Sequence, residues 1–344
     1  MVLRWGGALF GDAVGAKDSA GSGPACCAVL TIAASLVMLS SAHAVDNIPP
    51  RPAAPSGLSF DASIDGLYGR RNYSDAVIVQ DTVTTATALS GNNFSFDDKG
   101  GVDARLRIGY GPWAVEGRYF GGFKWSASRT DTTPGIFNFP TVPPLFGLGV
   151  AALDSDATGR LHSFEGNLRW AANSQIVVFA GGRWVSQPDR LAVFADFGAN
   201  AATISWDSDF KAIGPQIGFD ARLFGPRTPF NPLHYVFLDV DARLGYLWSS
   251  GKQTFSVVQN IGPAFGARGS FHDTTLAYEL GAALGIAITP NVELRAGYRY
   301  FVLENGVFAP DLIGATNVIN ARINQATTRV AVNTVSFGLR AVFP

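Results

Sequence analysis

The sequence predicts an all-β protein: a closed antiparallel transmembrane β-barrel of about ten strands. Three observations support this prediction: long stretches in which apolar and polar residues alternate, a regular alternation of long and short connections, and paired charges on the polar face of the stretches. A period of two places successive side chains on opposite faces of a strand. One-sided apolar strands of about 9–11 residues suit a bilayer, whereas strands of soluble domains average about 5–6 residues.

Residues 1–44 are interpreted as a signal peptide with a long or misassigned start. An apolar run ends in the small residues SSAHA at 40–44. At roughly 15 residues the run resembles an h-region with its cleavage site, and it is shorter than the ~20 residues that a membrane anchor, the alternative, requires. Cleavage after Ala44 would remove Cys26 and Cys27, the chain's two cysteines, so the mature protein would need no disulfide.

Residues 45–57 are rich in proline and predict an extended linker, which leaves 58–344 for the barrel. Twelve strands are the alternative to ten, if 189–198 and 253–260 pair as an extra hairpin. The ten strands that the alternation predicts span 58–65, 100–110, 113–119, 159–171, 175–187, 210–224, 235–249, 276–288, 292–303 and 335–343.

The connections sort by length. Long polar loops are expected at 71–98, 127–157, 188–208, 250–272 and 304–326, and short turns are expected at 109–112, 172–174, 225–234 and 289–291. Short periplasmic turns and long outer loops are typical of outer-membrane barrels, so we expect export to the outer membrane of a Gram-negative cell. No apolar span of helical length follows Ala44, which excludes a helical membrane protein. A closed barrel also pairs all backbone groups away from water.

The polar face predicts a charged interior. Five acid-x-Arg pairs place both side chains on one strand face, where each pair is expected to bond laterally. Acids and arginines are equal in number, which favours a cross-linked interior with a narrow water path or none. The expected interior charges are Asp61, Asp65, Asp103, Glu116, Glu165, Asp220, Asp239, Asp241, Glu279, Glu293, Arg105, Arg107, Arg118, Arg169, Arg183, Arg222, Arg243, Arg295, Arg299 and Arg340.

Aromatic residues near both ends of the apolar faces predict interfacial girdles against outer-membrane lipid. The net charge of −1 gives no sign of a nucleic-acid partner. No residue is assigned a catalytic, cofactor-binding or metal-binding role, and the sequence indicates no oligomeric state. The expected girdle residues are Tyr110, Trp113, Trp170, Tyr235, Phe343, Tyr246, Trp248, Tyr298 and Tyr300.

The strand segments VEGRYFGGFKW, GPQIGFDARLF, VFLDVDARLGYLW and VELRAGYRYF resemble those of pore-forming outer-membrane proteins of the Legionella major-porin type. The resemblance covers most of 100–344 and implies a narrow porin that passes small hydrophilic solutes or ions. Phe343 is similar to the terminal aromatic residue that the outer-membrane assembly machinery reads in such families, although Pro344 follows it. The alternative is a plugged structural or adhesive surface barrel without transport.

An enzyme is not expected. A ten-stranded barrel of this size also resembles the omptin proteases, which hold acidic and Asp/His pairs on outer loops. The chain offers Asp154 and Asp156 in one long loop and His272-Asp273 in another. The omptin Asp and His are separated by one residue and stand in the opposite order, so the pattern does not match.

Overall fold

The computed structural model describes the chain from residue 57 to 343 with internal gaps. The expected signal peptide, most of the expected linker and the expected turn at 225–234 lie outside the described residues. The described parts fall within one compact unit, residues 50–344. The described residues are 57–72, 76–81, 87–90, 94, 96–131, 137–138, 152–173, 175–198, 200–224, 236–260, 262–317, 320–324 and 326–343.

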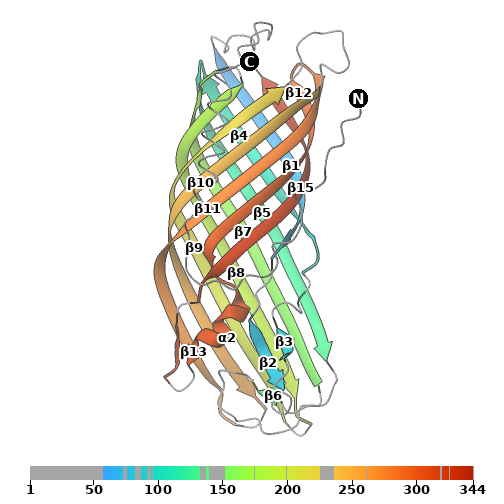
Figure 1. Cartoon of the computed structure of the whole chain (residues 1–344), viewed down its shortest axis with the longest axis vertical. Helices are drawn as coiled ribbons and strands as arrows, with labels where there is room; N and C mark the ends of the chain where they lie inside the picture. Colours follow the sequence, from blue (N-terminus) through green and yellow to red (C-terminus); the bar gives the residue numbers. More distant parts are fainter. Residues whose placement is uncertain are drawn as a thin grey trace, which may run out of the picture. The chain divides into compact units, whose positions relative to one another are not determined.

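Ten antiparallel strands form a closed barrel (Figure 1), which confirms the predicted fold. The first strand pairs with the last along Phe60–Arg71, so the ring has no open edge. Around the ring the strands follow the order β10-β9-β8-β7-β5-β4-β1-β15-β12-β11, and β11 pairs in turn with β10. The strands are β1 Leu58–Arg71, β4 Lys99–Tyr110, β5 Trp113–Asp131, β7 Ala152–Ala171, β8 Ile176–Asp196, β9 Ala201–Phe224, β10 Val236–Gln259, β11 Phe265–Thr289, β12 Val292–Gly306 and β15 Thr328–Phe343.

The strands are longer than predicted at the end of the barrel where the long connections lie. Residues 189–196 continue β8 and 253–259 continue β10, so the alternative with an extra hairpin is wrong. Most of the residues expected in the long loops at 188–208 and 250–272 belong to strands instead. The connections between these strands are only 197–200 and 260–264. We define the short-turn half as the part of the barrel next to the short turns, and the loop half as the part beyond it.

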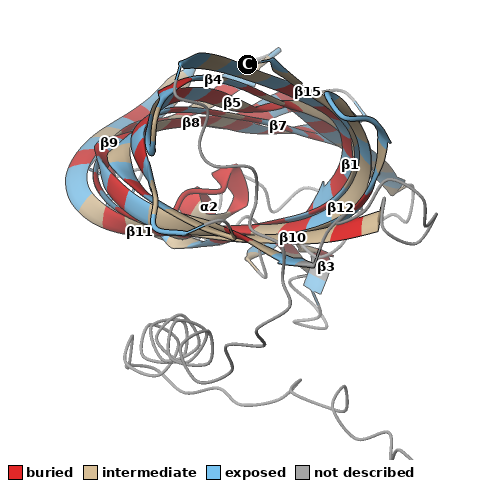
Figure 2. Ribbon diagram, turned by 90° about the horizontal axis from the view of Figure 1, so that it is seen from above, coloured by how far each residue is buried: buried red, intermediate tan, exposed pale blue. Residues whose placement is uncertain are grey.

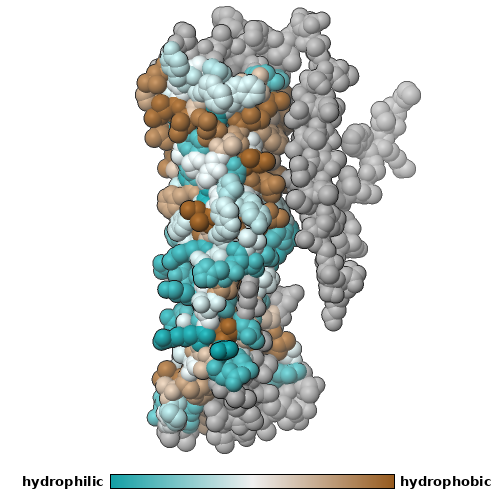
Figure 3. All heavy atoms as spheres, turned by 90° about the vertical axis from the view of Figure 1, so that its left-hand side faces the viewer, coloured by the Kyte–Doolittle hydropathy of each residue, from teal (hydrophilic) through white to brown (hydrophobic). Residues whose placement is uncertain are grey.

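The outer face of the short-turn half is apolar. Large exposed side chains recur at every second position, for example Leu168 at 54% and Ile217 at 60% exposure. Figure 3 shows hydrophobic residues gathered toward one end of the barrel and hydrophilic residues farther along. Of the expected girdle residues, Tyr235 lies outside the described residues and Tyr300 is half-buried. The other girdle residues are exposed on the barrel: Tyr110, Trp113, Trp170, Phe343, Tyr246, Trp248 and Tyr298.

The apolar band fits a bilayer on physical grounds, because it leaves its large hydrophobic side chains without protein cover. None of the helices in the described ranges has both the length and the apolar character needed to cross a membrane.

Halfway along the strands, the outer face changes from apolar to mostly polar and the inner face changes from charged to apolar. In the loop half most outward residues are polar, such as Ser126 and Thr158, although Phe194 and Val258 are exposed there, while the inward residues form a large apolar core. The inward aromatic residues Trp125, Trp206, Phe210 and Phe255 of this half are at most 1% exposed. The alternation of apolar and polar residues therefore continues into the segments expected to be long loops, but there the polar side chains point outward into water.

The chain itself fills the inside of the loop half. The segment between β12 and β15 forms the 3-10 helix η3 (Ala309–Asp311), the helix α2 (Leu312–Ala315) and the short strands β13 (Thr316–Asn317) and β14 (Arg322–Ile323). Figure 2 shows α2 inside the ring of strands. A small sheet joins β3, β2 and β6 in the same half. Its strands are β2 Val77–Asp81, β3 Thr87–Ser90 and β6 Phe137–Asn138.

Candidate functional site: the barrel interior

The twenty charged residues expected in the interior all face inward. Strand alternation puts each of them on the face opposite the apolar band, as in β5, where Glu116 and Arg118 alternate with exposed Val115. Each of the twenty lies within 4 Å of an oppositely charged member of the same set. Eighteen of the twenty are linked into one ionic network inside the short-turn half, and Asp65 and Arg295 form a separate pair, so every expected charge has a partner.

The pairing differs from the expected lateral pattern. Asp103 and Arg105 do bond along β4, with 2.9 Å between Oδ2 and Nη2. Asp241 and Arg243 are a looser pair at 3.6 Å. The other three acid-x-Arg pairs make no bond within the strand. Their arginines reach neighbouring or distant strands instead, because a guanidinium on a long stem spans the narrow lumen more easily than it folds back two residues.

Arg118 is the centre of the network. Its guanidinium bonds Asp103 through two nitrogens at 2.9 and 3.0 Å, Glu165 at 2.7 Å and Glu279 at 2.6 and 3.1 Å. The side chains of Arg118 and of these three acids are completely buried. Such charges are tolerated away from water only because each is paired and hydrogen-bonded.

Glu279 gathers a second set of arginines. Arg183 donates to it at 3.0 Å, and Arg299 donates to the other carboxylate oxygen. Arg243 completes this layer by donating to Glu165 at 3.0 Å. Two carboxylates are thereby surrounded by guanidinium groups from strands on all sides of the lumen.

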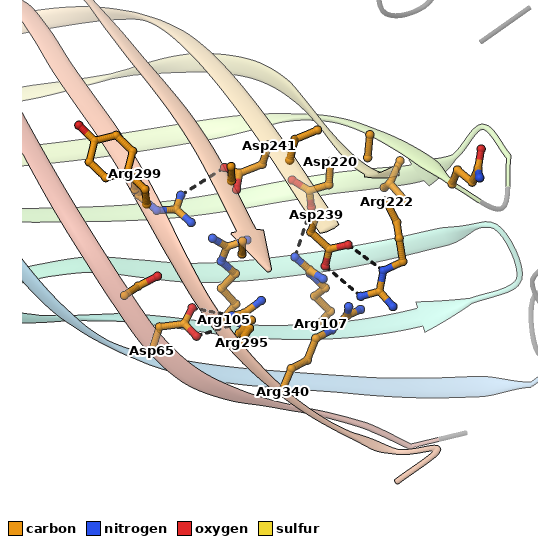
Figure 4. A pocket seen from close by; sticks show the side chains of 18 of the residues that line it. Asp65, Arg105, Arg107, Asp220, Arg222, Asp239, Asp241, Arg295, Arg299 and Arg340 are labelled. Carbon is orange, nitrogen blue, oxygen red and sulfur yellow. Dashed lines mark hydrogen bonds and ion pairs between the residues drawn. The ribbon is translucent and has the colours of Figure 1, made fainter. Parts of the chain in front are cut away.

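A further layer lies toward the short turns, around a pocket of about 90 Å3 (Figure 4). This is space for several water molecules, since one needs about 10–15 Å3 by the same measure. Arg222 bonds Asp239 at 2.7 and 2.9 Å, and Arg295 bonds Asp65 at 2.6 and 2.8 Å. The pocket is thus lined by charges that are already paired with one another.

The network is capped on the other side by aromatic residues. Phe120 lies between Phe123 and Phe301, with ring centroids 5.7 and 5.8 Å apart, and Phe123 stacks on Trp125 at 4.8 Å. All four rings are at most 1% exposed. Along the lumen, the described side chains therefore change from paired charges to close-packed aromatic rings.

We call residues 307–315 the plug segment. Asp189 on β8 accepts the Ala309 amide at 2.9 Å and the Arg71 guanidinium at 2.7 Å. The Arg71 guanidinium also lies 4.9 Å from the centroid of the Phe308 ring. Beside it, Gln187 donates to the Val307 carbonyl at 2.8 Å. These contacts fasten the plug segment to the barrel wall.

Sequence reasoning missed Asp189, Gln187 and the plug segment. Asp189 falls in the expected loop at 188–208, Gln187 is the last residue of the expected strand before it, and the expected loop at 304–326 hides the plug segment. The sequence of the plug segment does indicate burial, because it contains a cluster of apolar residues that is unusual in a solvated loop. The cluster consists of Val307, Phe308, Leu312 and Ile313.

The residues compared with the omptin proteases do not meet. Asp154 and Asp156 face outward on β7, and His272 faces outward on β11. Three strands, β8, β9 and β10, separate β7 from β11 on one side of the ring. Among the described residues, no group of three His, Cys, Asp or Glu side chains is placed to hold a metal ion.

No family model and no curated protein sequence matches this chain. Solved structures with a similar arrangement include the outer membrane protease OmpT from Escherichia coli, at 11% identity over 84% of this chain and 97% of that chain, with a TM-score of 0.43. The translocator domain of autotransporter NalP from Neisseria meningitidis is similar at 11% identity over 92% and 96%, with a TM-score of 0.36. The P. putida toluene transporter TodX is similar at 10% identity over 84% and 90%, with a TM-score of 0.32. These similarities are too low to assign an activity.

Proposed function

We propose that this protein is an integral outer-membrane β-barrel that is closed to solutes in its resting state. The closed ring, the apolar outer band and the polar outer face of the loop half support the membrane placement. In this proposal the loop half stands above the membrane as a rigid, water-facing platform, which corresponds to a plugged structural or adhesive surface barrel.

The observation that carries the proposal is the contact between Arg118 and Glu279. These residues lie on β5 and β11, on opposite sides of the ring, and their side chains meet at 2.6 Å with neither exposed to water. The plug segment and the aromatic cap lie beyond this contact. A solute would have to break a buried charge network and displace an apolar core to pass, which is costly on both counts.

Planar-bilayer conductance tests the proposal. Purified protein, shown to be folded by heat-modifiable migration on a gel, is expected to give no discrete conductance steps. A variant that lacks the plug segment and also carries Arg118→Ala, Glu279→Ala, Phe120→Ala and Phe301→Ala is the positive control, because it removes the plug segment, the central ionic contact and the middle of the aromatic cap; its folding is checked in the same way. Discrete steps from the unaltered protein would contradict the proposal.

A narrow porin of the Legionella major-porin type is the second candidate function. The pocket at the short-turn end favours it, because a charged, water-sized space already leads partway into the barrel. Passage of small hydrophilic solutes or ions would then require the plug segment to move. Conductance that appears when only the plug segment is deleted would favour this candidate over a permanently closed barrel.

We also propose a non-enzymatic role and assembly through the C-terminal strand. The separation of Asp154, Asp156 and His272 supports the absence of an omptin-like protease site. Phe343 supports the second point, since it ends β15 and is 52% exposed. Replacing Phe343 by Ser is expected to lower the amount of folded protein in the outer membrane, as measured by heat-modifiable migration of membrane fractions.

A further inference from the structure

Lys124 on β5 and Arg160 on β7 form an uncompensated pair of positive charges on the outer face of the barrel. They are direct partners in the antiparallel register of β5 and β7, and both side chains are exposed. Like charges opposite each other on neighbouring strands are destabilising. Neither residue has an acidic partner within 4 Å among the described residues, whereas some other outward cations do: Lys211 lies 3.0 Å from Asp209 and Arg190 lies 3.5 Å from Asp207.

The pair lies at the edge of the apolar band. Along β7 the outward residues run from Trp170 through Leu168 and Phe164 to His162 and then Arg160. About ten residues separate Trp170 from Arg160, which is roughly 33 Å along a strand and about 25 Å along the barrel axis at the usual tilt. That height equals the usual apolar band, so Arg160 stands where lipid headgroups begin.

The surface below the pair is aromatic. The Tyr119 hydroxyl and His162 Nδ1 are hydrogen-bonded at 2.9 Å, and the Tyr119 and Phe164 rings lie 4.8 Å apart. Phe164 is 50% exposed. Going outward, the strand pair thus presents an apolar and aromatic surface for an acyl chain, then two cations side by side.

We propose that Lys124 and Arg160 bind the phosphate-bearing headgroup of an outer-leaflet lipid whose acyl chain lies against Tyr119 and Phe164. A phosphate between the two cations removes their repulsion and accepts hydrogen bonds from both, with the guanidinium offering two parallel donors. A lipid fits better than a free anion, because the adjoining apolar band holds its chain. The site rests on the membrane placement proposed above and is independent of whether the barrel conducts.

A second like-charged pair provides a matched control. Arg268 on β11 and Arg322 on β14 are also register partners and are both exposed. They lie near the 260–264 connection, at the far end of the loop half and away from the apolar band of the short-turn half. If positive charge alone attracts the lipid, both pairs should contribute equally to binding. If the site is specific for a lipid headgroup, only Lys124 and Arg160 should contribute.

Native mass spectrometry of detergent-solubilised protein tests the site with phosphatidic acid as the probe. The double variant Lys124→Gln/Arg160→Gln is expected to bind it about 30-fold more weakly, since one basic residue near an anionic lipid contributes about fivefold. The variant Arg268→Gln/Arg322→Gln is expected to stay within about twofold of the unaltered protein. Diacylglycerol with the same chains, which lacks the phosphate, is expected to bind weakly to all three.

Three results would overturn the proposal: equal losses in both double variants, equal binding of diacylglycerol, or displacement of the lipid by an equal concentration of inorganic phosphate. The single variant Lys124→Gln keeps the test open if the double variant does not fold, and about a fivefold loss is expected for it. Liposome insertion of the unaltered protein is measured separately. Protein that inserts but binds no phosphatidic acid refutes this site alone, whereas protein that fails to insert refutes the membrane placement.

Discussion

Arg118 and Glu279 lie five strands apart in either direction around the ten-stranded ring, yet Nη2 of the arginine is 2.6 Å from Oε1 of the glutamate. The contact therefore crosses the full width of the lumen. Both side chains are completely buried, and each has further partners of opposite charge. A direct bond across the centre fixes the cross-section of the barrel, because the two walls cannot separate without breaking it.

Removing one partner of this contact is expected to destabilise the barrel strongly. Arg118→Ala leaves Asp103, Glu165 and Glu279 with one cation fewer in a dry interior, and breaking such a buried pair costs about 3–5 kcal/mol. The free energy of unfolding, measured by urea titration in detergent with tryptophan fluorescence, should fall by this amount. The control Arg70→Ala breaks an exposed pair with Asp98 and is expected to cost at most about 1 kcal/mol. Equal losses for the two variants would show that the central contact contributes no more than a surface ion pair.

Closure between the first and last strands is expected to depend on Gly338. A Cβ atom at Gly338 would overlap the backbone oxygen of Ile64 and would lie 2.6 Å from Asp65 Cα, both on β1. Gly338→Ala should therefore push β15 away from β1 and reduce the folded fraction on a heat-modifiability gel. Gly166→Ala is the matched control, because a Cβ there meets nothing within 4 Å on the outer face. A fully folded Gly338→Ala protein would contradict this expectation.

The plug segment is expected to loosen when Asp189 is truncated. Asp189→Ala removes the acceptor of the Ala309 amide and leaves Arg71 buried without an anion. Hydrogen exchange at the Ala309 amide should accelerate by about tenfold or more, since a lost buried hydrogen bond costs about 1–3 kcal/mol. Asp207→Ala, which removes an exposed partner of Arg190, should leave that exchange rate unchanged. An unaltered rate in Asp189→Ala would mean that the apolar packing alone holds the plug segment.

The apolar band makes a separate prediction about membrane contact. Ile217 is 60% exposed on β9, and Ile217→Arg would place a charge against lipid at a cost of about 2–4 kcal/mol near the midplane. Ser126→Arg lies on the polar outer face of the loop half and is expected to change stability by less than about 0.5 kcal/mol. Unfolding from liposomes measures both variants. Equal costs would contradict the assignment of the band to lipid.

The strands of the short-turn half, and which of their side chains point inward, could be predicted from the sequence. In this half the alternation combines a uniformly apolar face with a face of recognisable charges. It also placed the twenty interior charges on the inward face. It could not supply their partners, since Arg295 finds Asp65 across two strand pairings that no local spacing encodes. The loop half was misjudged for a physical reason: outward Ser, Thr and Asp residues resemble a loop in composition, although inward Leu191, Val193 and Trp206 maintain the period of two.

The exchange of inner and outer character along the strands has a thermodynamic consequence. Unfolding the loop half brings its buried aromatic core into water, and newly hydrated apolar surface raises the heat capacity of a protein. The short-turn half buries charge inside and already exposes its apolar face, so releasing its interior adds polar surface, which lowers the heat capacity. Cooling should therefore affect the stability of the two halves in opposite directions. The hydrophobic stabilisation of the loop half is the one that weakens as the temperature falls.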